Sequence, residues 1–207
     1  MDTSQFEILS SIFEQEAEWL SKVIHRRIDI TLGRRINEYS NQTPHEHVST
    51  IQPPDFKSTS ISYTDFILEN KLSFEERVLL ALSIIPHLKP CLLLDEFREF
   101  GMEKSVRRDF AIELPETGLV KGQNFGGIMP TGLTFLFLVG GRELTQRLKA
   151  ASFLSSENIL FEKKVIHLER TPSGDPIYSG KLILSQAYFE IFTSATIANT
   201  ETYANEN

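Results

Sequence analysis

Hydrophobic positions in residues 4–30 recur in steps of three and four, the spacing that places side chains on one face of a helix. Ser4 followed by Glu7 is a capping-box pattern, typical of a helix start. Most acidic residues of this stretch, Glu16 among them, fall outside the apolar face. We therefore predict one long amphipathic helix, packed on its own core or on another helix. The predicted apolar face consists of Phe6, Leu9, Phe13, Ala17, Leu20, Ile24 and Ile28.

Residues 39–60 differ in composition, being rich in Ser, Thr, Pro, Asn and Gln and poor in large apolar side chains. Such a segment is typical of a linker or a long exposed loop. It divides the chain into an N-terminal helical unit, 1–38, and a body, 61–195, which is followed by a polar tail, 196–207. We expect this linker to separate the first helix from the body.

The body begins with predicted helices. Residues 62–69 form a short one, and Ser73 with Glu76 gives a second capping box. The stretch that follows, 78–85, is apolar nearly all round, which indicates a central and buried helix. Pro90 fits the first position of the next helix, where its missing N–H is not needed.

Residues 99–129 show no sustained period and contain several glycines, which predicts an extended loop. A short apolar helix is predicted over 131–139, and Gly140 with Gly141 ends it. A second helix is predicted over 142–153. Its predicted inward residues are Leu144, Leu148 and Ala151.

The hydrophobic period changes to two at 165–170, which indicates a strand. Residues 171–176 are dense in turn formers, and 178–184 are predicted to be the returning strand. A closing helix is predicted over 185–193. The expected fold is thus mainly α with a small β-hairpin near 164–184, a winged-helix-like body preceded by a long amphipathic helix.

The overall charge, the apolar runs and the single cysteine each argue against particular classes of protein. The chain has 207 residues and a formal net charge of -7 at pH 7, so its long-range field disfavours general binding to nucleic acids or anionic membranes. No apolar run approaches the about 20 residues of a membrane span, and the first residues lack the pattern of a secretory signal. Cys91 is the single cysteine, which excludes a disulfide scaffold. We expect a cytoplasmic protein without a membrane partner.

The glycine-rich segment 118–132 is the first candidate for chemistry, because consecutive backbone N–H groups in such a loop can hold a phosphate. A P-loop needs Gly-Lys followed by Ser or Thr, whereas Lys121 is followed by Gly122 and Gln123. The segment stays open to three interpretations: a structural loop, a peptide or protein contact, or a nucleotide site. Its candidate interaction residues are Lys121, Gln123, Asn124 and Phe125.

Other clusters of reactive residues are too sparse to predict a catalytic or metal site. His45 and His47 stand in a polar segment without further ligands. His87 and Cys91 are four residues apart, but prolines interrupt a regular helix there and no third group orients the pair. The carboxylates at 95–103 lie among basic residues and indicate a salt-bridged surface. We therefore predict neither an enzyme nor a cofactor or metal site.

A weak basic patch is spread over 142–181, with Lys163 and Lys164 as its adjacent pair. A winged helix that grips DNA usually shows a stronger basic stripe. DNA binding through these lysines is the alternative to protein binding.

Four stretches together resemble a known bacterial domain: 72–82 (LSFEERVLLAL), 86–95 (PHLKPCLLLD), 118–124 (GLVKGQN) and 130–132 (PTG). That domain precedes the AAA+ ATPase module in proteins encoded with contractile injection systems, the phage-tail-like machines. The resemblance extends over roughly residues 5–193.

The resemblance implies a variant winged-helix fold used for protein contacts, with an AAA+ ATPase or contractile tail components as partners. Two positions depart from the family, which usually has His in place of Phe125 and an acidic residue in place of Leu133. The chain holds neither a Walker A nor a Walker B motif, so the family's ATPase residues cannot be carried over. The expected function is a non-catalytic interaction domain, free-standing or the N-terminal part of a longer protein. Phe13 and Leu20 are the candidate contacts of its first helix, with a partner or with a second copy.

Overall fold

The computed structural model describes four stretches of the chain: 3–33, 47–57, 61–104 and 115–194. The α-helices are α1 (Thr3–Leu32), α2 (Ser62–Glu69), α3 (Phe74–Leu88), α4 (Leu92–Lys104), α5 (Gly132–Gly140), α6 (Leu144–Ser152), α7 (Ile159–Glu162) and α8 (Gln186–Thr193). The remaining elements are the short helices η1 (Val48–Thr50), η2 (Pro115–Thr117) and η3 (Ile177–Ser179) and the strands β1 (Val120–Lys121), β2 (Ile128–Met129), β3 (Ile166–Leu168) and β4 (Leu182–Leu184).

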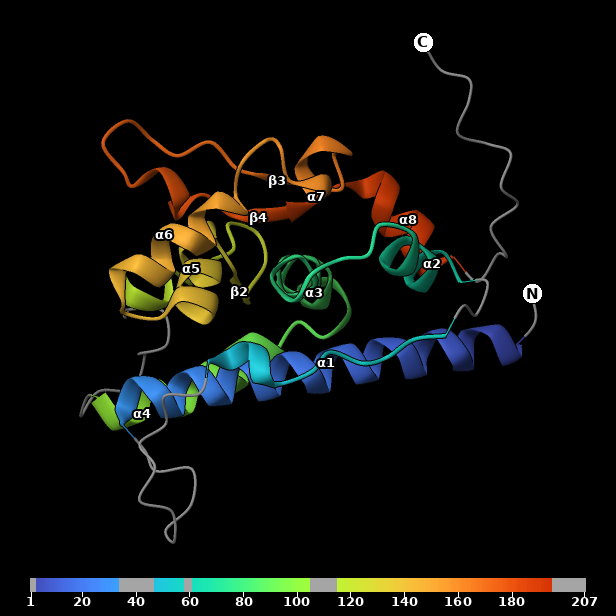
Figure 1. Ribbon diagram of the computed structural model, residues 1–207, viewed down its shortest axis with the longest axis horizontal. Helices are drawn as coiled ribbons and strands as arrows, with labels where there is room; N and C mark the ends of the chain where they lie inside the picture. The colour runs from blue at the N-terminus through green and yellow to red at the C-terminus, as the bar shows by residue number, and fades with distance from the viewer. Residues whose placement is uncertain (1–2, 34–46, 58–60, 105–114, 195–207) are drawn as a thin grey trace, which may run out of the picture.

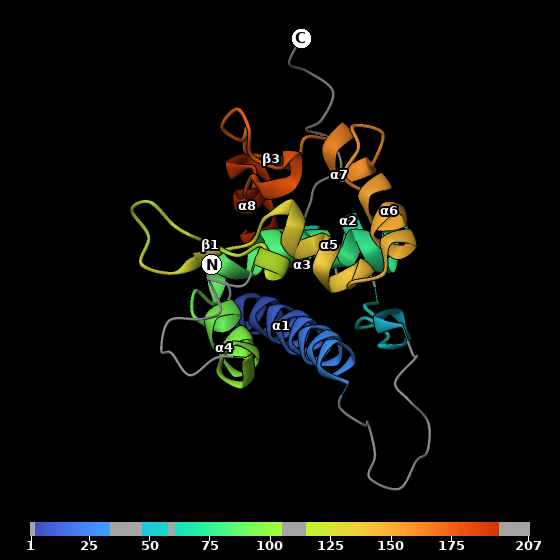
Figure 2. The same cartoon turned by 90° about the vertical axis from the view of Figure 1, so that its left-hand side faces the viewer.

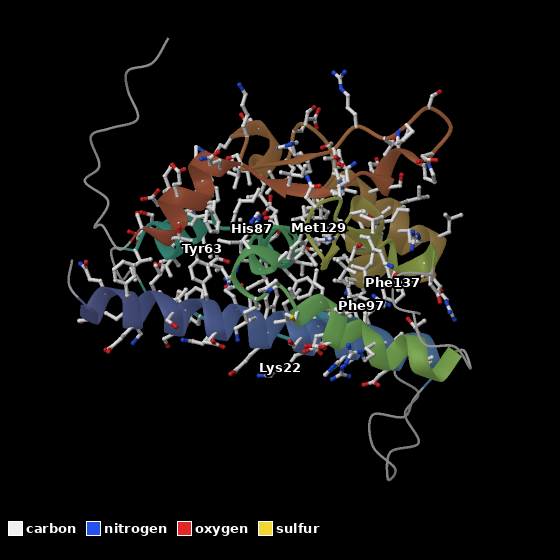
Figure 3. All side chains as sticks on the ribbon, turned by 180° about the vertical axis from the view of Figure 1, so that it is seen from behind. Lys22, Tyr63, His87, Phe97, Met129 and Phe137 are labelled. Carbon is white, nitrogen blue, oxygen red and sulfur yellow. The ribbon has the colours of Figure 1, made fainter. Side chains whose placement is uncertain are left out.

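Helix α1 runs along one side of the molecule, and α4 lies beside its C-terminal half (Figure 1). Helix α3 crosses the middle, and the β3–β4 hairpin lies on the side opposite α1. Helices α2 and α8 are at one end, and α5 and α6 are at the other. A single hydrophobic core joins these elements, and the rings of Phe97 and Phe137, 6.2 Å apart, connect α4 to α5 within it (Figure 3).

The long first helix is confirmed, but it begins earlier than its sequence pattern indicates. Helix α1 starts at Thr3, so Ser4 lies inside the first turn and the capping box predicted there is wrong. Most of the predicted apolar face is buried, including Phe13 and Leu20. Phe6 is the exception, with 44% of its surface exposed.

The buried face of α1 is wider than its hydrophobic stripe. Glu16, expected outside that face, is fully buried, and so is the indole of Trp19, whose Nε1 donates to the carbonyl of Ile51 at 3.1 Å. Two neighbours cause this: α3 covers one flank of α1, and the segment around η1 covers another. A period of 3.6 residues shows one stripe only, so this second covered flank could not be read from it.

The described part of the predicted linker, 47–57, contributes to the core. Val48 and Phe56 are buried in the same cluster as α1 and α3. These residues therefore do not form a fully exposed loop. The division of the chain into a helical unit, a linker and a body stays a prediction.

Helices α2 and α3 are confirmed. The capping box of α3 is present, because the Glu76 N–H donates to Ser73 Oγ at 3.3 Å and the Ser73 N–H donates to Glu76 Oε2 at 2.8 Å. Residues 77–86 of α3 are buried, as expected of a central helix. Pro86 lies inside α3 rather than at its end, and Pro90 precedes α4 instead of occupying its first position.

The stretch 99–129 is more ordered than the extended loop that we expected. Helix α4 continues to Lys104, and β1 pairs with β2 in an antiparallel hairpin, with Val120 opposite Met129. The absence of a hydrophobic period does not exclude strands here, because a strand of two residues is too short to show a period.

Helices α5 and α6 are confirmed as elements, with the Thr131 hydroxyl accepting from the N–H of Thr134 at 3.3 Å at the start of α5. The predicted inward face of α6 is wrong for Leu144 and Leu148, whereas Ala151 is partly buried against the core as predicted. Leu144 and Leu148 are 70% and 65% exposed, while Ala150 is buried. Helix α6 packs closely on α5 through its small residues, so its leucines face outward.

Arg27 of α1 holds the C-terminal end of α5. Its Nε donates to the carbonyl of Leu138 at 2.8 Å and its Nη2 to that of Val139 at 3.0 Å, which satisfies acceptors that a helix end leaves free. Burial lowers the pKa of Arg27 to about 10. Gly141 has a φ of 62°, and a Cβ there would lie 2.2 Å from Arg27 Nη1, so glycine is required at this position.

The predicted C-terminal hairpin and closing helix are confirmed, but the returning strand is shorter than the predicted 178–184, because Ile177–Ser179 form η3 and β4 covers only Leu182–Leu184. Strands β3 and β4 are antiparallel, with Ile166 opposite Leu184, and the Ser185 hydroxyl caps α8. The two hairpins are joined, because the Leu182 N–H donates to the carbonyl of Pro130 at 2.9 Å. The fold is thus mainly helical with two small antiparallel hairpins and a long N-terminal helix.

Within the described ranges, no single helix is long and apolar enough to cross a membrane. Helix α3 and the following Leu92–Arg98 reach that length and composition only as a pair, and they are bent by 110° from one another.

Candidate protein-interaction site

A pocket of about 430 Å³ opens beside the C-terminal end of α3, against the β1–β2 hairpin. The loop of this hairpin projects from the body (Figure 2). Two segments far apart in the sequence therefore form the walls of the pocket, which are mainly apolar. We call it the α3–hairpin pocket. Its lining residues are Pro86, His87, Pro90, Phe125 and Met129.

The ring of Phe125 lies over the backbone of its own loop. A Cβ on Gly127 would come within 2.4 Å of Phe125 Cε1 and Cζ, so the ring fits only because residue 127 has no side chain. The Gly122 N–H donates to the carbonyl of Gly127 at 3.1 Å and closes the loop. The glycines thus give Phe125 a defined place on the pocket wall, where 39% of its surface stays exposed.

The helix side of the pocket is built by the end of α3. His87 packs its ring against Phe189 of α8, with centroids 5.2 Å apart, and burial lowers the pKa of His87. The imidazole is therefore neutral at pH 7. Met129 of β2 faces the same pocket, and both residues are labelled in Figure 3. A neutral ring, a thioether and two prolines suit an apolar or aromatic side chain of a ligand.

The exposed residues of the loop add polar groups next to the pocket. Gln123 and Asn124 are exposed amides, and Lys121 is an exposed cation. In the part of the chain that the structure describes, no carboxylate forms an ion pair with Lys121. The loop can therefore offer hydrogen bonds to a peptide backbone and one positive charge to an acidic side chain.

The structure brings together only half of the eight predicted interaction residues. Lys121, Gln123, Asn124 and Phe125 lie together on the β1–β2 hairpin and its loop. The other four lie away from it. Lys163 and Lys164 are exposed where α7 turns into β3, Phe13 lies on the wall of a separate groove, and Leu20 is fully buried.

The sequence predicts that α1 presents Phe13 and Leu20 to a partner, but Leu20 is buried in the protein's own core. The Leu20 side chain is covered by the protein's own core, so it is closed to a partner in this conformation. The apolar stripe of α1 is used mostly for packing, and its exposed apolar residues lie near its N-terminus.

The loop of the glycine-rich segment, 122–127, does not run directly into a helix N-terminus, as a phosphate loop does. Residues 122–127 connect two antiparallel strands, and β2 separates them from α5. Among the described residues, no group of three His, Cys, Asp or Glu side chains is placed to hold a metal ion. His45 lies outside the described residues.

The comparisons with known proteins give no match. No protein-family model matches the chain, and neither a curated protein nor a solved structure does. We therefore infer a function from the α3–hairpin pocket and from the four stretches that resemble the bacterial domain.

Sequence reasoning found the loop side of the pocket but missed its helix side. The signal there is a histidine between two prolines at a helix junction, and the sequence singles out 86–90 only through the resemblance and the spacing of His87 and Cys91. Met129 gave no signal of its own. The contact of the hairpin with α3 joins residues that are distant in sequence, and no local pattern encodes it.

The other cluster of titratable groups is buried between α1, α2 and α3. Arg77 donates from Nη2 to Glu16 Oε1, and its guanidinium carbon lies 5.6 Å and 5.2 Å from the ring centroids of Trp19 and Phe56. Burial, together with the nearby Glu16 carboxylate, raises the pKa of Tyr63. These groups are closed to solvent, so we assign them a structural role: they hold α1 against α3.

Burial raises the pKa of Glu16 from 4.5 to about 7, against the opposing effect of the Arg77 guanidinium. The folded protein therefore holds this proton more tightly than the unfolded chain does. The resulting stabilisation is fully present below pH 4.5 and is lost as the pH rises through about 7. We expect the free energy of unfolding to fall by up to about 3 kcal/mol over this range, at about 1.4 kcal/mol per pKa unit.

Urea unfolding at several pH values between 4.5 and 7 measures this effect. The Glu16→Gln variant is expected to lose the slope that Glu16 contributes. Glu18→Gln, which changes an exposed residue of the same helix, is expected to keep it. Equal slopes in Glu16→Gln and in the wild type would contradict the shifted pKa.

Proposed function

We propose that this protein is a non-catalytic interaction domain that binds an extended segment of a partner protein in the α3–hairpin pocket. The observation that carries the proposal is the apolar pocket of about 430 Å³, next to a hairpin that exposes two amides and the cation of Lys121, which pairs with no carboxylate in the described part of the chain. Ligand sites usually combine such an apolar cavity with a few polar groups at its edge.

The chemistry of the walls indicates what the partner contributes. An apolar or aromatic side chain would fill the space between Phe125, Met129 and the prolines. The loop amides would bond to the partner's backbone, and Lys121 would pair with an acidic residue beside the inserted side chain. His87 is the single titratable group among the residues that line the pocket, which favours binding over acid–base catalysis.

The resemblance supports a setting for this interaction. We propose that the partner is an AAA+ ATPase or a tail component of a contractile injection system, met in the cytoplasm. The protein would act as an accessory of the ATPase or as its N-terminal domain, with a variant winged-helix fold. The stretches that carry the resemblance include the helix side of the pocket, 86–90, and flank its hairpin side at 118–124 and 130–132.

A capture experiment with matched variants tests the proposal. The tagged protein is exposed to a lysate of its source cells, with and without nuclease, and bound proteins are identified by mass spectrometry. Phe125→Ser is expected to reduce capture of an ATPase, tail-tube or sheath protein by about tenfold, which corresponds to about 1.4 kcal/mol. Leu148→Ser removes an even more exposed apolar side chain from α6 and is expected to leave capture unchanged.

Two outcomes would overturn the proposal. Capture that survives Phe125→Ser undiminished would place the partner elsewhere on the surface. Capture that nuclease abolishes, and that Lys163→Glu with Lys164→Glu weakens, would support the DNA-binding alternative instead.

A further inference from the structure

A second surface, independent of the α3–hairpin pocket, lies on the N-terminal half of α1. This end of the helix extends past α2 and α8 (Figure 1). Phe6 and Ile8, close to it, are 44% and 45% exposed, although both are large apolar side chains. Phe6 lines the groove described next, whereas Ile8 lies on the other side of α1, toward Asp55 and Lys57. Exposed apolar surface beside a groove is a feature of interaction sites.

A groove of about 330 Å³ runs beside Phe6, between α1 and the C-terminal end of α3. Leu9 and Phe13 form its α1 side, and Ile85 and Leu88 form its α3 side. It is therefore apolar along its floor and open to solvent. The ion pair between Lys89 and Glu14 stands at its edge.

The outer face of α1 beside this groove is acidic. Glu7, Glu14 and Glu18 follow one another at intervals of seven and four residues, which aligns them along one side of the helix. All three are exposed, and in the described ranges neither Glu7 nor Glu18 forms an ion pair. Lys22 continues this outward face one turn later (Figure 3). The groove thus has an apolar floor and an acidic border.

We propose that this groove binds an amphipathic helix of a partner protein whose apolar face is flanked by lysine or arginine. Apolar residues at helical spacing would enter beside Phe6 and Phe13, and the basic flank would meet Glu7 and Glu18. A second copy of this chain is a poorer fit. Antiparallel pairing of two α1 helices would bring two acidic rows close together, in a protein with a net charge of -7.

Synthetic peptides test the proposal on the full chain, with fluorescence anisotropy as the readout. One amphipathic peptide carries leucines on one face flanked by lysines, and a second has the same leucines flanked by glutamates. The lysine peptide is expected to bind at least about tenfold more tightly than the glutamate peptide. Its affinity is expected to fall as salt is added, because exposed charges are screened.

Variants locate the binding. Phe6→Ser, and separately Glu7→Gln with Glu18→Gln, are each expected to weaken binding of the lysine peptide by about tenfold. Both variants change exposed side chains, and circular dichroism checks that the fold is kept. Phe125→Ser is expected to have no effect, so a failure here is distinguishable from a failure of the α3–hairpin pocket.

Three results would overturn this inference. The lysine peptide could bind no better than the glutamate peptide, or binding could be unchanged in both variants. Alternatively, light scattering could show a dimer that Phe6→Ser dissociates, which would make a second copy the occupant of the groove.

Discussion

Replacement of Arg77 by methionine is expected to lower the free energy of unfolding at pH 7 by about 3 kcal/mol, because it leaves the buried Glu16 carboxyl without its cation. Methionine retains much of the apolar volume between Trp19 and Phe56, so the loss comes mainly from the unpaired carboxyl. Glu16 takes up a proton in this variant, which keeps the cost at the lower end for a broken buried pair. Urea unfolding measures it.

Two further variants make this result specific. Glu16→Leu combined with Arg77→Met is expected to regain most of the loss, because apolar residues can replace a buried ion pair. Lys89→Met breaks the exposed pair with Glu14 and is expected to cost less than about 1 kcal/mol. An Arg77→Met variant as stable as Lys89→Met would show that the buried pair does not hold α1 against α3.

The second large effect is expected from Leu20→Asp, which should lower the free energy of unfolding by more than about 4 kcal/mol. Leu20 is fully buried, so the substitution removes apolar packing and buries a carboxylate without a cation. Ile8→Asp on the same helix is the matched control, because Ile8 is 45% exposed. It is expected to change stability by less than about 1 kcal/mol.

Thermal unfolding followed by circular dichroism separates the two variants. A Leu20→Asp protein that melts like the wild type would mean that this face of α1 is open to solvent. It would then restore the expectation that Leu20 contacts a partner. The packing of α1 on α3 predicts instead that loss of binding in Leu20→Asp comes with loss of the fold.

Local chemistry explains why much of the fold could be predicted from the sequence. The capping box at Ser73 and the apolar run behind it are sufficient to define α3, and both are confirmed. The change to a two-residue period and the turn formers after it likewise define the β3–β4 hairpin. These signals act over a few residues, so tertiary packing does not alter them.

Packing between residues distant in sequence explains the positions where the predicted burial is wrong. Glu16 is buried because Arg77, 61 residues away, supplies its cation. Leu144 and Leu148 follow a helical period, yet α6 meets α5 through Ala150 and turns both leucines outward. A periodic pattern identifies an apolar face but not which neighbour covers it.

One wall of the candidate site could be predicted from the sequence, and the other could not. The glycine-rich loop could be singled out from its composition, and Phe125 was among its candidate residues. The opposite wall, Pro86 to Pro90, depends on where the hairpin folds against α3. That arrangement is a property of the tertiary structure, so the pocket became visible only with the fold.

Hydrogen exchange of the protein bound to its captured partner tests the central claim most directly. Binding in the α3–hairpin pocket predicts slower exchange of backbone amides at 120–129 and at 87–89, with exchange at Lys163 and Lys164 unchanged. Slower exchange at those two lysines, with none at 120–129, would contradict the assignment of this pocket as the partner-binding site.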